Sequence, residues 1–468
     1  MEGLYSLLPA PAIVTQESDP AAYKVLTSFW AAQLNLSPKA IVSPPDVKTL
    51  AKTIQYLYSH TELDFAFRGR GYSSLPTKDV LVSLHNLDEF TYDPDKQTIT
   101  VGAGQSWMTV YEALERLAPN YTVVGARTPS VSVGGTVVTA GFSWLSGKFG
   151  CISDPQNMID CEVVKYDGSV VWASTEPALL WAIRGGGGGY GAITKIIFQL
   201  HPISRSIYYG TVIAPMSALT EVTHRISEFS TSTTVDPGVS AFMFIQREKF
   251  RAMHESNESK GDGDVLVFQL FDLNGETHGR QAFSWALELP GAKDFTREGS
   301  MLDVIKIQDR VSDLIGTSRQ NWATIIVPEF SVSQIQHSAQ WFKDLGTHGN
   351  SIAQNTYMIY ELFCTKDSPT PAQLSWPGPR GCKHMLVIGL GCDLNAADEV
   401  IQRAQELAQS APSYLMGDDP RITPTPNAIE EWSDLSKIYG DNYKDLLKLR
   451  LKYDPKRRFK GSIKITQS

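Results

Sequence analysis

The stretch Phe67-Arg-Gly-Arg-Gly-Tyr-Ser-Ser74 decides how this chain is interpreted, and it follows a short apolar run at 63–67. The apolar run predicts a buried strand, and the two glycines after it allow backbone conformations that a β-carbon would forbid. Successive N–H groups that point inward in such a turn form a concave anion-binding site. Because guanidinium groups bind phosphate through charge-assisted hydrogen bonds, the two arginines suit a diphosphate. For these eight residues alone, an ordinary strand-end turn with solvated arginines is the alternative.

Length and composition indicate a large globular protein with more than one lobe. The chain has 468 residues, of which 42% are hydrophobic and 20% are charged, so it can form buried cores. The formal net charge of −8 argues against a nucleic-acid partner, because phosphate contacts need a basic surface. Five cysteines without CxxC spacing indicate free thiols rather than a disulfide framework or a metal site.

The N-terminal residues do not resemble a signal peptide. The N-terminus has neither a basic start nor an apolar stretch of signal-peptide length. No run approaches the roughly 20 apolar residues that a membrane span needs. We therefore expect an intracellular, cytoplasmic protein that has no membrane partner.

Capping residues place helices among predicted strands in the first two hundred residues. Ser43 precedes two prolines and an aspartate, which is a good helix start, and apolar residues then recur at helical spacing. Ser106 and Thr175 are expected to cap two further helices. Helices and strands thus alternate, which predicts an α+β lobe.

Glycine-rich segments connect these elements. The stretch 124–144 has too little apolar periodicity for a helix and suits a backbone that runs flat against a ligand. Asp167-Gly168 between two apolar runs predicts a β-hairpin. Five consecutive glycines at 185–189 separate an apolar helix from an apolar strand. A flexible linker would carry serine and charge, so we expect close backbone packing here instead.

The pattern changes near residue 205, where strands with alternating faces begin. The pattern predicts an antiparallel sheet that helices cover on one face and that is open on the other. Strands are predicted at 207–213, 240–247, 265–271, 355–363 and 384–392, and helices at 217–230, 276–289, 332–345 and 396–411. The predicted organisation is a lobe at 1–204, a substrate-binding sheet with helices at 205–428, and a C-terminal return to the lobe at 429–468.

Taken together, these segments resemble the vanillyl-alcohol-oxidase superfamily of flavoproteins, with its PCMH-type FAD-binding lobe, and within it the berberine-bridge-enzyme-like oxidases. The resemblance covers about residues 24–203 and 432–464. It implies an α+β fold in which two subdomains hold FAD in an extended shape, with the flavin ring facing the antiparallel sheet. The segments that carry it are 68–73, 129–135, 167–171, 180–194, 439–446 and 452–459.

The resemblance also implies which residues hold the cofactor. The loop after the first strand would wrap the diphosphate, and the second glycine-rich segment would line the path to the ring. Val163 would lie near the adenine, and the C-terminal segment would close over the flavin. The implied residues are Arg68, Gly69, Arg70, Gly71, Tyr72, Ser73, Ser74, Thr128, Gly134, Gly135, Gly141, Ser143, Val163, Asn442 and Tyr443.

The chain departs from the family pattern at several of these positions. Tyr72 stands where the family has its covalent histidine, and Thr128 stands where bicovalent members have a cysteine. The resemblance therefore implies FAD that is bound without a covalent bond and has lower oxidising power. Side chains at Ser132, Thr139 and Ala140 replace family glycines. These added β-carbons leave open a redox-silent or cofactor-free descendant.

The catalytic base is expected on the open face of the sheet. Oxidation by a flavin needs a hydride donor and a base for the substrate's O–H or N–H proton. On the strand predicted at 355–363, Tyr357 and Glu361 share the less apolar face. A half-buried glutamate there would have a raised pKa and could act as the base. A solvated glutamate beside a core tyrosine is the alternative. Tyr72 is expected either to donate a hydrogen bond at the ring edge or to fill space.

These inferences predict an FAD-dependent oxidoreductase, either an oxidase or an oxidative cyclase. Its substrate would be a small organic molecule of secondary metabolism, and O2 is a candidate electron acceptor. A non-redox cyclase or isomerase, with FAD structural or absent, is one alternative, and a binding protein without catalysis is another. Anaerobic bleaching of a yellow protein by substrate would distinguish the first from the other two.

Overall fold

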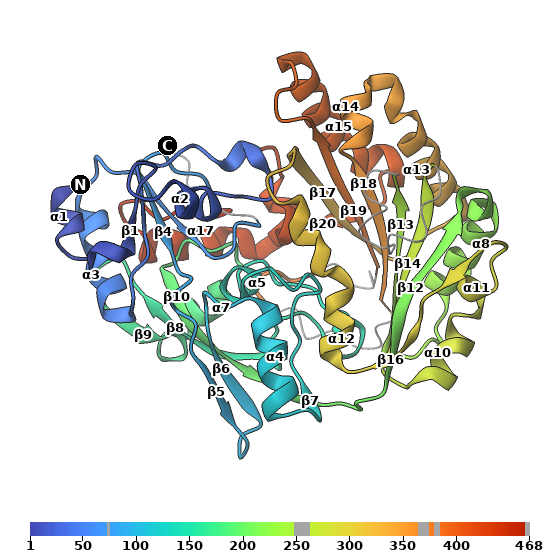
Figure 1. The fold of residues 1–468 in the computed structure, drawn as a ribbon, viewed down its shortest axis with the longest axis horizontal. Coiled ribbons are helices and arrows are strands. Elements are labelled where there is room, and N and C mark those ends of the chain that lie inside the picture. Colours follow the sequence, from blue (N-terminus) through green and yellow to red (C-terminus); the bar gives the residue numbers. More distant parts are fainter. Residues whose placement is uncertain (73–74, 248–262, 364–373, 379–383, 464–468) are drawn as a thin grey trace.

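The computed structural model describes residues 1–72, 75–247, 263–363, 374–378 and 384–463 (Figure 1). One lobe contains the N-terminal two hundred residues and the C-terminal helices, and the other is a large sheet with its helices. No helix in the described ranges is long and apolar enough to cross a membrane.

The first sheet contains the strand that ends at Arg68 and leads into the glycine-rich loop. Its strand order is β1-β2-β4-β3, and the last three of these strands run parallel. Helix α3 (Val47–Ser59) buries an apolar stripe beside it. The helix cap is Asp46, whose carboxylate accepts the Thr49 N–H at 2.7 Å, so the prediction that Ser43 caps this helix is wrong. The strands are β1 (Ile13–Val14), β2 (Ala40–Val42), β3 (Phe65–Arg68) and β4 (Val80–Ser83).

The second sheet is antiparallel, with strand order β5-β6-β10-β8-β9. The predicted hairpin at Asp167-Gly168 is confirmed, because it joins β8 to β9 in antiparallel register. The predicted cap of helix α4 (Trp107–Leu117) is also confirmed, since the Ser106 side chain accepts the Thr109 N–H. The strands are β5 (Phe90–Asp93), β6 (Thr98–Gly102), β8 (Met158–Val164), β9 (Val170–Trp172) and β10 (Ala192–Gln199).

Two local predictions in this lobe are wrong. The stretch 124–144 contains a short helix, α5 (Val133–Val137), whose first N–H groups bond to carbonyls of the 103–105 segment. Helix α7 (Pro177–Ile183) has Glu176 rather than Thr175 at its N-cap position. Thr175 ends a preceding 3-10 turn, where its hydroxyl donates to the Trp172 carbonyl at 2.7 Å.

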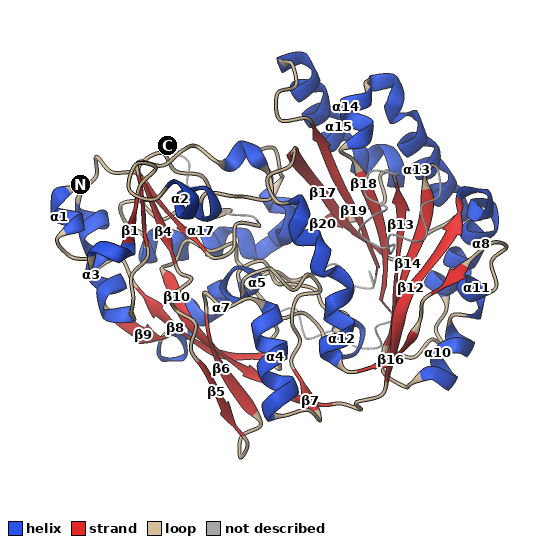
Figure 2. Ribbon diagram, in the orientation of Figure 1, coloured by secondary structure: helices blue, strands red, loops and turns tan. Residues whose placement is uncertain are grey.

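The second lobe is built on a mainly antiparallel sheet of nine strands, ordered β15-β12-β14-β13-β18-β19-β17-β20 with β16 paired to β12 (Figure 2). The prediction of helices on one face is confirmed. Helices α8 (Leu219–Thr231), α13 (Val332–Asp344) and α15 (Asp398–Met416) share a hydrophobic core with one side of the sheet. The strands are β12 (Ile207–Pro215), β13 (Val239–Gln246), β14 (Val265–Asp272), β15 (Lys293–Asp294), β16 (Arg297–Gly299), β17 (Arg319–Val327), β18 (Tyr357–Phe363), β19 (His384–Cys392) and β20 (Thr423–Pro424).

Two features of this lobe differ from the prediction. Strand β17 was not predicted, although it pairs with β19 over its whole length. The helix predicted at 276–289 is broken into α10 (Glu276–Ala282) and α11 (Ser284–Leu287). The break lies at Phe283, whose side chain is fully buried and whose ψ of 13° departs from the α-helical range.

The C-terminal helices α16 (Leu435–Tyr439) and α17 (Tyr443–Tyr453) return to the first lobe and contact the five-glycine run. A β-carbon on Gly186 would lie 2.8 Å from Leu446, and one on Gly189 would lie 2.1 Å from the Arg450 guanidinium. The backbone at Gly189 also has a φ of +85°. The prediction of close backbone packing is therefore confirmed, and the run is not a linker.

Replacing one of these glycines is expected to destabilise the fold. We expect Gly189→Ala to lower the free energy of unfolding by about 2–4 kcal/mol, because it combines an unfavourable φ with a clash against a buried arginine. Gly346→Ala is the matched control, since nothing lies within 4 Å of its added β-carbon. Chemical denaturation measures both, and equal stability of the two variants would contradict the packing role.

Candidate functional site

A cavity of about 150 Å³ lies between the open face of the large sheet and the first lobe. On β18, alternate residues face the cavity, so Tyr357, Ile359 and Glu361 all line it. The other lining residues are Trp30, Tyr72, Arg127 and Thr128 from the first lobe, Gln308, Val311 and Leu314 from the segment before β17, and Phe242, Phe244, Gln246, Gln269, Trp322 and Val387 from neighbouring strands.

An ion pair between Arg127 and Glu361 crosses this cavity from the first lobe to the sheet. The Glu361 side chain is only 2% exposed. Burial raises the pKa of Glu361 above its ordinary value, although the Arg127 guanidinium opposes the shift. Arg127 also lies over the Phe242 ring, with 4.6 Å between the guanidinium carbon and the ring centroid. The pair thus places a basic carboxylate beside a permanent cation in an apolar setting.

Aromatic side chains from distant parts of the chain form one wall of the cavity. Trp30 stacks on Tyr72 at a centroid distance of 5.6 Å, and Trp322 meets Tyr357 edge-on at 5.9 Å. The Tyr72 hydroxyl hydrogen-bonds to the Ser130 hydroxyl, and burial raises the pKa of Tyr72 to about 12. Tyr72 is therefore a neutral phenol that is held in place by stacking and by this hydrogen bond.

A series of hydrogen-bonded neutral side chains forms another wall of the cavity. The Thr128 hydroxyl donates to the Gln308 side-chain oxygen at 2.9 Å, and the Gln308 amide donates to Gln269 at 2.8 Å. Thr128 was singled out from the sequence, but Arg127 and Gln308 were not. The position of Arg127 directly before Thr128 was the available signal, whereas Gln308 lies in a segment with no recognisable motif.

The loop after β3 has two arginines with different surroundings. The Arg68 guanidinium donates to the Ser28 carbonyl at 2.9 Å, and burial lowers the pKa of Arg68 to about 10. Arg68 thus connects the loop to the segment around Ser28. Arg70 has a buried Nε without a hydrogen-bond partner among the described residues, and burial lowers its pKa as well. The pKa of nearby His85 is lowered first by burial and then by both arginines, while Asp88 opposes the shift, so two positive charges face one carboxylate around this loop.

The structure brings some of the predicted cofactor residues together and leaves others apart. Gly69 faces Ser132 so closely that an added β-carbon would lie 2.2 Å from its hydroxyl. Gly134 and Gly135 lie in α5, and Gly141 (φ +75°) and Ser143 follow it. The remaining positions do not line the cavity; they are Gly71 in the first loop, Val163 in β8, and Asn442 and Tyr443 at the start of α17. Ser73 and Ser74 lie outside the described residues.

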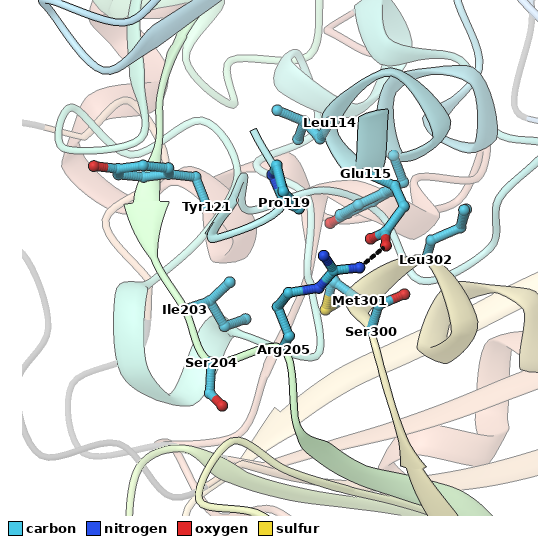
Figure 3. Close-up of a pocket in the computed structure, with 11 residues that line it drawn as sticks. Leu114, Glu115, Pro119, Tyr121, Ile203, Ser204, Arg205, Ser300, Met301 and Leu302 are labelled. Atoms are coloured by element: carbon cyan, nitrogen blue, oxygen red, sulfur yellow. Dashed lines mark hydrogen bonds and ion pairs between the residues drawn. The ribbon is translucent and has the colours of Figure 1, made fainter. Parts of the chain in front are cut away.

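A smaller cavity of about 10 Å³, with room for little more than a water molecule, lies between α4 and the segments that lead into the second lobe (Figure 3). Arg205 and Glu115, which line it, form an ion pair with 2.5 Å between the charged atoms. Both side chains are partly exposed, at 56% and 28%. The smaller cavity is lined by none of the site residues predicted from the sequence, so the larger cavity is the candidate site.

Comparisons with known proteins bear on the fold and on the cofactor. An FAD binding domain family matches residues 38–174. The chain is 29% identical over 330 residues to the FAD-dependent monooxygenase tpcD of Cochliobolus heterostrophus, covering 67% of this chain and 61% of that protein. It is 26% identical over 459 residues to an FAD-linked oxidoreductase of Dictyostelium discoideum, covering 93% and 90% of the two chains.

The solved structure of Physcomitrella patens BBE-like 1 superposes with a TM-score of 0.78 at 19% identity, covering 99% of both chains. The chain spans 61% and 56% of the first two curated relatives that it matches. These comparisons confirm the predicted fold class. The chain contains an FAD-binding domain and has the fold of the berberine-bridge-enzyme-like proteins.

The described residues fit an FAD molecule at two points. The unpartnered Nε of Arg70 lies in a loop of positive charge, which suits a diphosphate. The Ser143 hydroxyl is fully buried and also has no hydrogen-bond partner among the described residues, which suits a polar ligand atom along the second segment.

Removal of the Arg70 charge is expected to weaken FAD binding without unfolding the protein. We expect Arg70→Met to reduce FAD affinity by about tenfold or more, since hydrogen bonds to charged groups contribute about 1.5–3 kcal/mol. Arg116→Met, at an exposed position on α4, is the control. Fluorescence titration of FAD measures the affinity, and an unchanged value for Arg70→Met would remove Arg70 from the diphosphate site.

Proposed function

From this FAD-binding domain and this fold, we propose that the protein is an FAD-dependent oxidoreductase, an oxidase or oxidative cyclase, whose substrate lies in the larger of the two cavities. Bound FAD supplies a hydride acceptor. The observation that carries the proposal is the buried Glu361 carboxylate, which faces the first lobe across the cavity and is paired with Arg127. The relatives named as FAD-dependent monooxygenases and oxidoreductases support the same reaction class.

In this proposal Glu361 accepts the proton of a substrate O–H or N–H group. Its raised pKa makes it a stronger base than an ordinary carboxylate, and its burial keeps water from competing for the proton. Arg127 remains charged throughout and would stabilise the negative charge that develops on the substrate oxygen. Burial also raises the pKa of Tyr357, so its phenol stays neutral and can orient the substrate by a hydrogen bond.

The cofactor is proposed to be held without a covalent bond, because Tyr72 and Thr128 occupy the attachment positions. The Tyr72 phenol is neutral and bonded to Ser130, and the Thr128 hydroxyl is bonded to Gln308. The substrate is proposed to be a small organic molecule of secondary metabolism, with O2 as the electron acceptor.

Acid precipitation is expected to release all of the flavin into the supernatant, because neither attachment position offers a histidine or a cysteine. Absorbance at visible wavelengths, recorded for the supernatant and for the redissolved pellet, measures the distribution. Flavin that remained with the precipitated chain would contradict non-covalent binding, and a colourless native protein that refuses added FAD would contradict the function itself.

Substitution of the proposed base is expected to slow the reductive half-reaction. Glu361→Gln should reduce the rate of anaerobic flavin reduction about tenfold or more, which is the usual contribution of a general base. In the unchanged protein this rate should rise with pH through a pKa above the ordinary value for glutamate, because only the ionised carboxylate accepts a proton. The variant should lack that rise.

Stopped-flow absorbance measures these rates with any substrate that bleaches the protein. Glu115→Gln is the matched control, because Glu115 forms an ion pair with Arg205 outside the candidate site. If Glu361→Gln and Glu115→Gln reduced the flavin equally fast, Glu361 would not be the base.

A further inference from the structure

The charges that line the large cavity are unusually few. Among its described lining residues, Arg127 and Glu361 are the only ones with charged side chains. The other polar groups are one threonine and two tyrosine hydroxyls, three glutamine amides and two tryptophan N–H groups, and the remaining lining residues are phenylalanines or aliphatic. The cavity is therefore neutral when Glu361 is ionised and carries one positive charge when Glu361 is protonated.

Of the two charged residues, Glu361 is the one that can lose its charge. A guanidinium stays protonated in proteins, whereas burial of the Glu361 carboxylate, which is 2% exposed, raises its pKa even though Arg127 opposes the shift. The other titratable groups in the described lining are Tyr72 and Tyr357, whose phenols burial keeps neutral. Two carboxylates adjoin the lining, namely Asp309 near Tyr72, and Glu430, which accepts the Trp322 backbone N–H at 2.7 Å and whose pKa burial raises to about 7. On the two strands that flank β18, the residues opposite Glu361 are Phe242 and Met385, and neither titrates.

Two further observations describe what would fit beside this pair. Stacked and edge-on aromatic rings at Trp30, Tyr72, Trp322 and Tyr357 provide flat apolar surfaces. Apart from the ion pair, the polar groups beside these rings are neutral hydroxyl, amide and indole N–H groups, so the lining offers a ligand one charge of each sign and otherwise neutral partners.

We propose that this cavity selects planar, largely apolar weak acids, whose ionised oxygen replaces Glu361 as the partner of Arg127 while Glu361 takes up a proton. An acid that arrives ionised draws this proton from solvent, so one proton is taken up for each molecule bound. An acid that arrives un-ionised, such as a phenol or enol, gives its own proton to Glu361, and no net proton is exchanged. This inference rests on the proposed function, since it takes the same cavity as the substrate site.

Isothermal titration calorimetry of the full-length holoprotein tests the inference without turnover. The probes are 2-naphthoate, its neutral isostere 2-naphthamide, and 2-naphthol. Titrations near pH 7 in two buffers with different ionisation enthalpies count the protons exchanged. We expect 2-naphthoate to bind with uptake of one proton and about tenfold or more tighter than 2-naphthamide. We expect 2-naphthol to bind with no net exchange.

Three variants assign the effect to the two residues. Arg127→Met should weaken 2-naphthoate about tenfold or more and leave 2-naphthamide nearly unchanged, which also shows that the cavity remains folded. Glu361→Gln should keep 2-naphthoate binding and abolish proton uptake. Arg205→Gln, which breaks the ion pair of the smaller cavity, should change neither.

Failure of 2-naphthoate to bind, equal affinity for 2-naphthoate and 2-naphthamide, or binding without proton uptake would overturn the inference. Each of these results leaves the oxidoreductase proposal standing, because that proposal is decided by flavin reduction. Conversely, a protein that binds 2-naphthoate with proton uptake but never bleaches its flavin would keep the acid-binding site and remove the oxidoreductase function.

Discussion

The buried ion pair between Arg127 and Glu361 is the interaction on which the geometry of the site depends. It joins the first lobe to the central strand β18 of the large sheet. Removing two charges from water costs several kcal/mol, and loss of either partner would leave the other charge uncompensated. Packing of Arg127 on Phe242, which in turn stacks on Trp144 at 4.2 Å, offsets part of this cost. The proposed chemistry and the contact between the lobes therefore depend on the same two side chains.

A second connection fixes the cofactor loop relative to the sheet. The Trp30 N–H donates to the Gly71 carbonyl at 2.8 Å, while two residues later the Ala32 N–H donates to the Ser318 carbonyl at 3.1 Å. The Gln33 side chain then bonds to both backbone groups of Gln320 at the start of β17. A short N-terminal segment thus touches the proposed diphosphate loop and the edge of the substrate wall, and a shift of either would move Trp30.

Features with a local signal were predictable from the sequence. The hairpin at Asp167-Gly168 and the helical cover of the sheet follow from turn residues and from apolar spacing. Strand β17 begins with Arg319, Gln320 and Asn321, and these polar residues concealed it although the strand is central to the pairing with β19. The partner of Glu361 could not be predicted, because Arg127 lies far away in sequence and only the tertiary fold brings the two together.

Ser132 and Ala140 stand where the resembling family has glycine, and their surroundings show how the backbone of the proposed cofactor-binding segment keeps its shape. The Ser132 side chain packs against Gly69, and a β-carbon on Gly69 would clash with it. Ala140 adopts a φ of +65°, a conformation that costs about 1–3 kcal/mol without glycine. Hydrogen bonds from Ser153 to the Ala140 carbonyl and from Ile152 to the Gly141 carbonyl hold this backbone in place. These hydrogen bonds from residues 152 and 153 hold Ala140 in a backbone conformation that glycine would adopt without strain. Because the strained conformation is kept, we infer that the segment retains the shape that cofactor binding requires.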